Sequence, residues 1–139
     1  MADAPLIDLE LITPEATLLA ATPEMVVVPG SEGEFGVLRD HAPILSALRP
    51  GTVQVHATFD SEPECYFVTG GFSEAGPKHC LILADEAVPV ADIDAAAADR
   101  AVADAEAALR EAENGPDEAA RKRAEQALEV ATARRAAAN

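Results

Sequence analysis

LILADEAVPVADIDAAAADR, residues 81–100, is the stretch that decides the fold, because two different sequence patterns meet within it. Before this junction, apolar residues come in short runs separated by turn residues, a pattern typical of β-strands. After it, 19 of the 45 residues from position 95 onward are alanine, the best helix former. We therefore predict two domains, a β domain over residues 1–90 and a helical domain over residues 91–139.

Upstream of the junction, the sequence predicts an antiparallel β-sandwich. In the first segment Ile7, Leu9 and Leu11 alternate with Asp8 and Glu10, which predicts one buried and one exposed face. Many short strands with no helical stretch between them favour a sandwich over a doubly wound parallel sheet. The predicted strands are residues 6–12, 17–21, 25–28, 35–38, 44–48, 52–58, 65–68, 72–75 and 80–84.

Downstream of the junction, the sequence predicts two antiparallel helices over residues 93–113 and 117–137. Asn114-Gly115-Pro116 between them is a stop and restart signal, and so short a loop joins antiparallel neighbours. Asp92 is the predicted N-cap, and Asp94 a charge that favours the first turn. One stripe is predicted at Ile93, Ala97, Ala101, Ala105, Ala108 and Ala112, with Val102 and Leu109 beside it, and the other at Ala120, Ala124, Ala127, Leu128 and Ala131. Such small residues bury little apolar area, so we expect a weakly stabilised hairpin.

The charge of the chain limits its partners. Its 25 acidic and 10 basic residues give a formal net charge of −15, which argues against binding nucleic acid or an anionic membrane surface. We expect partners with positive patches. No stretch is long and apolar enough to span a bilayer, and the first residues lack the pattern of a secretory signal, so we expect a cytoplasmic protein. Cys65 and Cys80 fit that compartment as buried thiols, with a disulfide as the alternative.

Residue types that carry chemistry show no matching pattern. His41, His56, His79, Cys65 and Cys80 lack paired metal-ligand spacing, so we expect neither a metal nor another cofactor. Gly70-Gly71 follows a strand without a helix or lysine after it, which predicts a bulge or kink and no phosphate site. Two other function classes stay open from the residues. One is a ligand-binding sandwich that dimerises through its hairpin, and the other is an enzyme that uses Asp, Glu, His or Cys groups, which a turnover lost on mutating His41 would support.

Four segments together resemble a known family. They are LELITPEATLLAATPEMVVVPG at residues 9–30, GSEGEFGVLRDHAPILSALRPG at residues 30–51, YFVTGG at residues 66–71 and LILADEAVP at residues 81–89. In order and spacing they resemble the epsilon subunits of bacterial F-type ATP synthases. The resemblance implies a β-sandwich followed by a helical hairpin, the plan reached above from the residues alone.

The resemblance also implies a role without catalysis. Members of this family belong to the central rotor stalk, where they link the gamma subunit to the membrane ring of c subunits and meet the alpha and beta subunits of the catalytic head. The chain would then lie peripherally on the cytoplasmic face of the bacterial inner membrane. It would touch the membrane only through the complex and would bind no nucleic acid.

Two loops match the contact regions of the family. Ser31, Glu32, Gly33 and Glu34 match the turn that faces the c ring, and an exposed carboxylate there could pair with basic residues. An ordinary solvated hairpin turn is the alternative. His41, Ala42 and Pro43 match a segment that contacts gamma. The alternative for His41 is a polar residue that closes a turn before Pro43.

The start of the first helix is compared with an ATP-binding motif of some relatives, I/L-D-x-x-R-A. Ile93 and Asp94 match, but Ala97 stands where the motif has arginine, and Arg100 comes three residues later. The missing guanidinium argues against ATP binding. The basic residues of the second helix would meet an acidic partner if the hairpin extended to inhibit ATP hydrolysis, or form a solvated face with pairs such as Arg121–Glu125. These residues are Arg121, Lys122, Arg123, Arg134 and Arg135.

Overall fold

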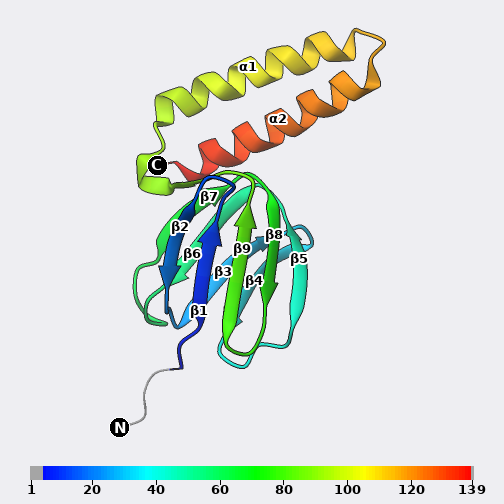
Figure 1. Cartoon of the computed structure of the whole chain (residues 1–139). Helices are drawn as coiled ribbons and strands as arrows, with labels where there is room; N and C mark the ends of the chain where they lie inside the picture. Colours follow the sequence, from blue (N-terminus) through cyan, green and yellow to red (C-terminus); the bar gives the residue numbers. More distant parts are fainter. Residues whose placement is uncertain (1–4, 139) are drawn as a thin grey trace. The chain divides into compact units, whose positions relative to one another are not determined.

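The computed structural model describes residues 5–138, and the chain divides into two compact units. One unit ends at Pro89 and contains the strands, and the other begins at Val90 and contains the helices (Figure 1). This architecture confirms the predicted β-sandwich followed by a two-helix hairpin.

The β unit has ten strands among the described residues. They are β1 (Asp8–Ile12), β2 (Thr17–Ala21), β3 (Met25–Gly30), β4 (Gly33–Leu38), β5 (Ile44–Leu48), β6 (Gly51–His56), β7 (Glu64–Val68), β8 (Gly71–Ala75), β9 (His79–Ala84) and β10 (Ala87–Pro89). Nine of these strands overlap the predicted segments. The short strand β10 was not predicted, and it pairs with β7 through Val88 and Phe67.

The strands form two layers. β4, β3, β6, β7 and β10 make one layer, and β5, β8, β9, β1 and β2 make the other. In Figure 1, β1, β8 and β9 lie in front of β3 and β4. A single residue pair, Gly30 with Leu48, carries the hydrogen-bonded path from one layer to the other. All pairs are antiparallel except β1 with β9, which are parallel from Asp8–His79 to Ile12–Leu83.

The core lies between the layers. Strand alternation sends every second side chain inward, and the predicted inward set Ile7, Leu9 and Leu11 is at most 2% exposed. The other inward side chains are mostly aliphatic: Val26, Val28, Val37, Leu48, Val53, Val55, Tyr66, Val68, Ala75, Cys80, Ile82 and Ala84. Ser73 is buried among them, and its hydroxyl oxygen has no hydrogen-bond partner.

Gly70 and Gly71 form the predicted kink between β7 and β8. Their φ angles are +150° and +128°, a region that L side chains rarely adopt. A Cβ atom at Gly71 would lie 2.0 Å from the carbonyl oxygen of Leu83 on the paired strand β9. Glycine is therefore required here both for the backbone conformation and for the close approach of β9.

The helical unit consists of a 3₁₀ turn η1 (Val90–Asp92), α1 (Ala95–Glu113) and α2 (Glu118–Ala137). The prediction of Asp92 as N-cap is wrong. Asp92 belongs to the 3₁₀ turn, so the backbone becomes extended only at Asp94, which caps α1. Asp117 caps α2 in the same way.

The stripe of partly buried residues on α1 also differs from the prediction. It consists of Ala95, Ala98, Val102, Ala105, Leu109 and Ala112, while the predicted Ala97, Ala101 and Ala108 are exposed. Val102 and Leu109 have the largest apolar side chains of α1, so their burial contributes most to stability. The face that contains them is therefore the less exposed face of the helix. On α2, Ala120, Ala124, Leu128 and Ala131 lie on the less exposed side as predicted, and Ala127 is exposed. An ion pair between Asp99 and Arg135 joins the two helices.

Candidate functional site

The outward face of the layer β5-β8-β9-β1 carries an exposed row of apolar side chains. Residue pairing places Ala47, Phe72, Leu83 and Ile12 side by side across the four strands. Phe72 is 56% exposed and Leu83 is 47% exposed. Neighbouring strands lie about 4.8 Å apart, so four residues in register extend over about 14 Å. We call these four residues the apolar row.

A second row runs beside the first on the same face. It contains Leu45, Glu74, Leu81 and Glu10, which are paired across the same strands. Leu45 is 72% exposed, the highest value among the large exposed hydrophobic residues of the described chain. We call these four residues the mixed row, because leucine and glutamate alternate within it. Two residues along a strand separate the rows by about 7 Å.

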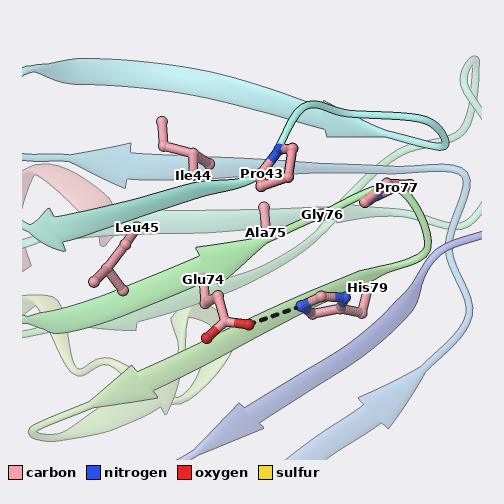
Figure 2. A pocket seen from close by; sticks show the side chains of 8 residues that line it. All are labelled: Pro43, Ile44, Leu45, Glu74, Ala75, Gly76, Pro77 and His79. Atoms are coloured by element: carbon pink, nitrogen blue, oxygen red, sulfur yellow. Dashed lines mark hydrogen bonds and ion pairs between the residues drawn. The ribbon is translucent and has the colours of Figure 1, made fainter.

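A cavity of about 360 Å³ lies at one end of this face (Figure 2). Within it, Nε2 of His79 donates a hydrogen bond to Oε1 of Glu74 at 3.1 Å. Figure 2 shows these two side chains facing each other from neighbouring strands, while Leu45 stands on the strand beside Glu74. The cavity is lined by Pro43, Ile44, Leu45, Glu74, Ala75, Gly76, Pro77 and His79. It combines an apolar wall with one oriented carboxylate.

A second cavity, of about 330 Å³, adjoins the apolar row. It is lined by Ile12, Thr13, Pro14, Gly71, Phe72, Leu83, Ala84 and Asp85. The apolar surface is therefore hollowed near the two ends of strand β9. An exposed apolar surface of this kind is typical of a protein that docks onto another protein.

The predicted ring-facing residues lie at the tip of the β3–β4 hairpin. Ser31 and Glu32 form the two-residue turn, and Gly33 and Glu34 begin β4. Gly33 has a φ of +138°, which only glycine adopts readily. The side chains of Ser31, Glu32 and Glu34 are exposed, so the tip presents two carboxylates to solvent.

The predicted gamma-contacting segment follows β4. The backbone N–H of His41 donates to the carbonyl of Leu38 at 3.1 Å and closes a turn in which Asp40 has a φ of 70°. The ring Nδ1 donates to the carbonyl of Ala42 at 2.6 Å. Its centroid lies 6.4 Å from that of Phe35. His41 is half-buried in this turn, and the exposed Ala42 continues the chain toward the cavity.

Pro43 is the member of this segment that lines the cavity of Figure 2. The structure thus connects the predicted segment His41 to Pro43 with the exposed sheet face through its last residue. It does not bring this segment together with the Ser31–Glu34 turn into one site, since the two lie at opposite ends of β4.

The residues compared with the ATP motif do not gather into a cluster. The carboxylate of Asp94 accepts hydrogen bonds from the backbone N–H groups of Ala96 and Ala97 at 2.9 and 3.3 Å. Arg100 is exposed and lies about 9 Å further along the helix axis. Ile93 is half-buried before the helix begins. Asp94 therefore satisfies the first N–H groups of α1.

The two cysteines are free thiols. Burial raises the pKa of the Cys80 thiol to about 12, so it stays protonated at neutral pH. Burial, and secondarily the nearby Glu62 carboxylate, raises the pKa of the half-buried Cys65. A raised pKa removes the reactive thiolate. Within residues 5–138, no group of three or more His, Cys, Asp and Glu side chains could hold a metal, and neither α1 nor α2 is long and apolar enough to cross a membrane.

Sequence reasoning missed the exposed sheet face. The signal was present, because alternation in β8 puts Phe72 on the same side as Glu74 and opposite the inward Ser73. A phenylalanine that shares a strand face with a carboxylate is expected to face outward. Four strands contribute to the face, however, and their order cannot be read from separate segments.

The fold and this surface are typical of a docking subunit of a larger assembly, and comparisons with known proteins agree. Residues 6–90 match the family described as "ATP synthase, Delta/Epsilon chain, beta-sandwich domain". The chain therefore belongs to the ATP synthase delta/epsilon chain family.

The ATP synthase epsilon chain of Parvibaculum lavamentivorans is 42% identical over 96 residues, which cover 69% of this chain and 72% of the relative. The ATP synthase epsilon chain 2 of Ralstonia nicotianae is 45% identical over 97 residues, covering 70% and 69% respectively. A chain in the OSCP/F1/c-ring structure of the Euglena gracilis mitochondrial ATP synthase aligns with a TM-score of 0.82 at 29% identity. That alignment covers 99% of this chain and 83% of the Euglena chain.

Proposed function

We propose that this chain is the epsilon subunit of a bacterial F-type ATP synthase, a non-catalytic member of the central rotor stalk. The family match over residues 6–90 carries this proposal. The relatives are named epsilon chains, and the Euglena structure is an F1 and c-ring assembly. In this role the chain transmits torque between the c ring and the gamma subunit and takes no part in bond chemistry.

The gamma subunit would dock on the exposed sheet face. The apolar row and the two adjoining cavities expose apolar surface to water. Burial of that surface against a partner is favourable by about 25 cal/mol per Å². The segment His41, Ala42 and Pro43 would lie at the margin of this contact, because Pro43 lines one of the cavities.

The turn formed by Ser31, Glu32, Gly33 and Glu34 would face the polar loops of the c ring. Its two exposed carboxylates favour basic partners, and Gly33 keeps the backbone at the tip uncovered. The alpha and beta subunits of the head would be further partners, and the chain would reach the cytoplasmic face of the inner membrane only through the ring.

The helical hairpin would have at most a weak regulatory role. Asp94 is engaged as a helix cap, and Ala97 occupies the position of the motif arginine, so we propose that α1 does not bind ATP. The alternative interpretation of the basic residues of α2 is a solvated charged face. The ion pairs of Arg121 with Glu118 and Glu125 support this alternative.

Co-purification tests the proposed function. The tagged full-length chain is recovered from gently solubilised membranes of its source, and every partner is identified by mass. We expect the gamma subunit, the catalytic head and the c ring in stoichiometric amounts. Recovery of the chain alone, or with unrelated soluble proteins, would refute the proposal and favour the ligand-binding sandwich.

Cross-linking in the same membranes tests the ring-facing turn. A chain with Glu34→Cys, in a background of Cys65→Ser and Cys80→Ala, should form a disulfide with a cysteine placed in the polar loop of the c subunit. Glu62→Cys, which puts the thiol in the loop after β6, is the matched control and should not cross-link. Equal yields from both variants would rule out a specific contact of the turn.

A further inference from the structure

We infer that the sheet face recognises charge as well as apolar shape. It would dock a partner surface on which a ridge of apolar side chains is flanked, about 7 Å away, by lysine or arginine side chains. This inference rests on the proposed function, because it specifies the surface of the gamma subunit that the face would bind.

The two rows differ in charge along the strand direction. The apolar row, with Phe72 and Leu83 at its centre, contains no ionisable side chain. The mixed row next to it has Glu74 paired with Leu45 and Leu81, so its carboxylate stands between two leucines. Two residues further along the strands from Leu81 and Glu10, His79 is paired with Asp8. The face therefore changes from apolar to acidic along the strand direction.

The strands of this face carry carboxylates and no side chain of lysine or arginine. The described strands β1, β5, β8 and β9 contain no lysine or arginine, and their acidic side chains are Asp8, Glu10 and Glu74. A carboxylate that is covered by a partner loses its hydration and destabilises the complex unless a cation or donor replaces the water. A partner that covers the leucines of the mixed row must also cover Glu74. His79 satisfies only Oε1 of that carboxylate, so a basic side chain of the partner that binds the other oxygen would favour the complex.

The carboxylate of Glu74 is oriented by a neighbouring histidine. Its Oε1 accepts a hydrogen bond from Nε2 of His79 at 3.1 Å, which holds the carboxylate at the wall of the cavity. A lysine or arginine side chain could lay its methylene groups along Leu45 and bring its charged end to this carboxylate. The cavity thus suits a long basic side chain better than a purely apolar one.

A second copy of this chain is a poor occupant. Two such faces in contact would bring together two sets of the carboxylates Asp8, Glu10 and Glu74 with no lysine or arginine on β1, β5, β8 or β9 to pair with them, and each copy has a net charge of −15. Like charges opposed in this way disfavour association.

Affinity measurements with the purified gamma subunit of the same source test the inference. We expect Glu74→Lys combined with Glu10→Lys to weaken binding at low salt by roughly a hundredfold, with a smaller loss at high salt, where charge is screened. Glu62→Lys combined with Asp60→Lys makes the same charge change in the loop between β6 and β7 and should weaken binding by no more than about threefold. Phe72→Ser tests the apolar row in parallel and should weaken binding by roughly tenfold or more.

The outcomes separate this inference from the proposed function. Loss of affinity in Phe72→Ser together with equal affinities for the two double lysine variants would overturn the inference while leaving gamma as the partner. Failure of the unaltered chain to bind gamma would refute the proposed function itself. Self-association of the unaltered chain that Phe72→Ser abolishes would also overturn the inference, because the occupant would then be a second copy.

Discussion

The sandwich and the helical hairpin are stabilised in different ways. The sandwich buries large aliphatic side chains completely, among them Ile7, Leu11 and Ile82, each 0% exposed. The buried residues of the two helices are Ala98 in α1 and Ala131 in α2. Full burial of a leucine or isoleucine contributes about 1.5–3 kcal/mol, whereas a single methyl group contributes far less. The sandwich of this chain is therefore held by its core, and the hairpin by local contacts.

Those local contacts are visible in the hairpin. Asp94 and Asp117 cap the two helices, and Asp99 pairs with Arg135 across them. A cap contributes about 1 kcal/mol, and an exposed ion pair between 0 and about 1 kcal/mol. The hairpin should therefore open at a lower free energy than the sandwich, in agreement with the weak stabilisation expected from its alanine content.

The largest loss of stability should come from a side chain placed where β8 closely approaches β9. Gly71→Ala puts a Cβ atom 2.0 Å from the carbonyl oxygen of Leu83 and keeps a φ of +128° that alanine resists. We expect a loss of about 4 kcal/mol or more in the free energy of unfolding of the sandwich. Urea unfolding followed by the fluorescence of Tyr66, the single tyrosine of the chain, measures it.

Gly33→Ala is the matched control for this change. Gly33 also has a positive φ, +138°, but a Cβ atom there meets nothing within 4 Å. The variant should lose only the backbone strain, about 1–2 kcal/mol. Similar losses at Gly71 and Gly33 would mean that strain alone explains both and that the approach of β9 is not tight.

A smaller effect should appear at alkaline pH, and only in the sandwich. The Cys80 thiol has an ordinary pKa of 9.0, which burial raises to about 12 in the folded chain. Between pH 9 and pH 12 the unfolded chain has lost the thiol proton that the folded chain keeps, so the free energy of unfolding falls as pH rises. Below pH 9 both states keep the proton, and the contribution of Cys80 to stability is fully present. From pH 9.0 to 10.5 the loss should reach about 1.5 kcal/mol.

Urea unfolding followed by NMR signals of sandwich methyl groups checks this pH dependence. Tyr66 has a raised pKa through burial and, to a lesser extent, the Glu64 carboxylate, and Cys65 is raised as well, so both add a fall of the same sign. The difference between the original chain and Cys80→Ala isolates the Cys80 part. Identical pH slopes for the two chains would contradict the assignment.

The smallest expected effect separates the true helix cap from the predicted one. Asp94→Ala removes the acceptor for the N–H groups of Ala96 and Ala97 and should destabilise α1 by about 1 kcal/mol. Asp92→Ala should change it by only a few tenths of that amount. Amide hydrogen exchange in α1 measures the difference, and β-strand amides should exchange as before in both variants. Equal protection losses would restore Asp92 as a cap.

The sequence was sufficient to locate nine of the ten described strands, because alternation and turn residues mark where they begin and end. Alternation in residues 6–12 predicted that Ile7, Leu9 and Leu11 are buried, and all three are. The break between the two helices was also predictable from local residues, because Gly115 and Pro116 lie after the end of α1 and before the start of α2.

The remaining features depend on contacts that local patterns do not report. Asp92 and Asp94 are equally good caps by residue type, and the 3₁₀ turn at Val90–Asp92 decides between them. The exposed sheet face depends on the order of four strands, and one of its pairings, β1 with β9, is parallel and joins distant positions. In an alanine-rich helix several faces are similarly apolar, so the pattern does not single out the one that is buried. In α1 the less exposed face is the one that contains Val102 and Leu109.

The parallel pairing of β1 with β9 has a consequence for the synthesis of this chain. β1 leaves the ribosome before the other described strands, yet its parallel partner β9 spans residues 79–84. Until those residues emerge, Leu9 and Leu11 lack the strand that carries Cys80 and Ile82 beside them. Pairings between such distant positions form slowly. β1 therefore lacks β9 until residues 79–84 have left the ribosome, and during that time its apolar face is exposed to chaperones.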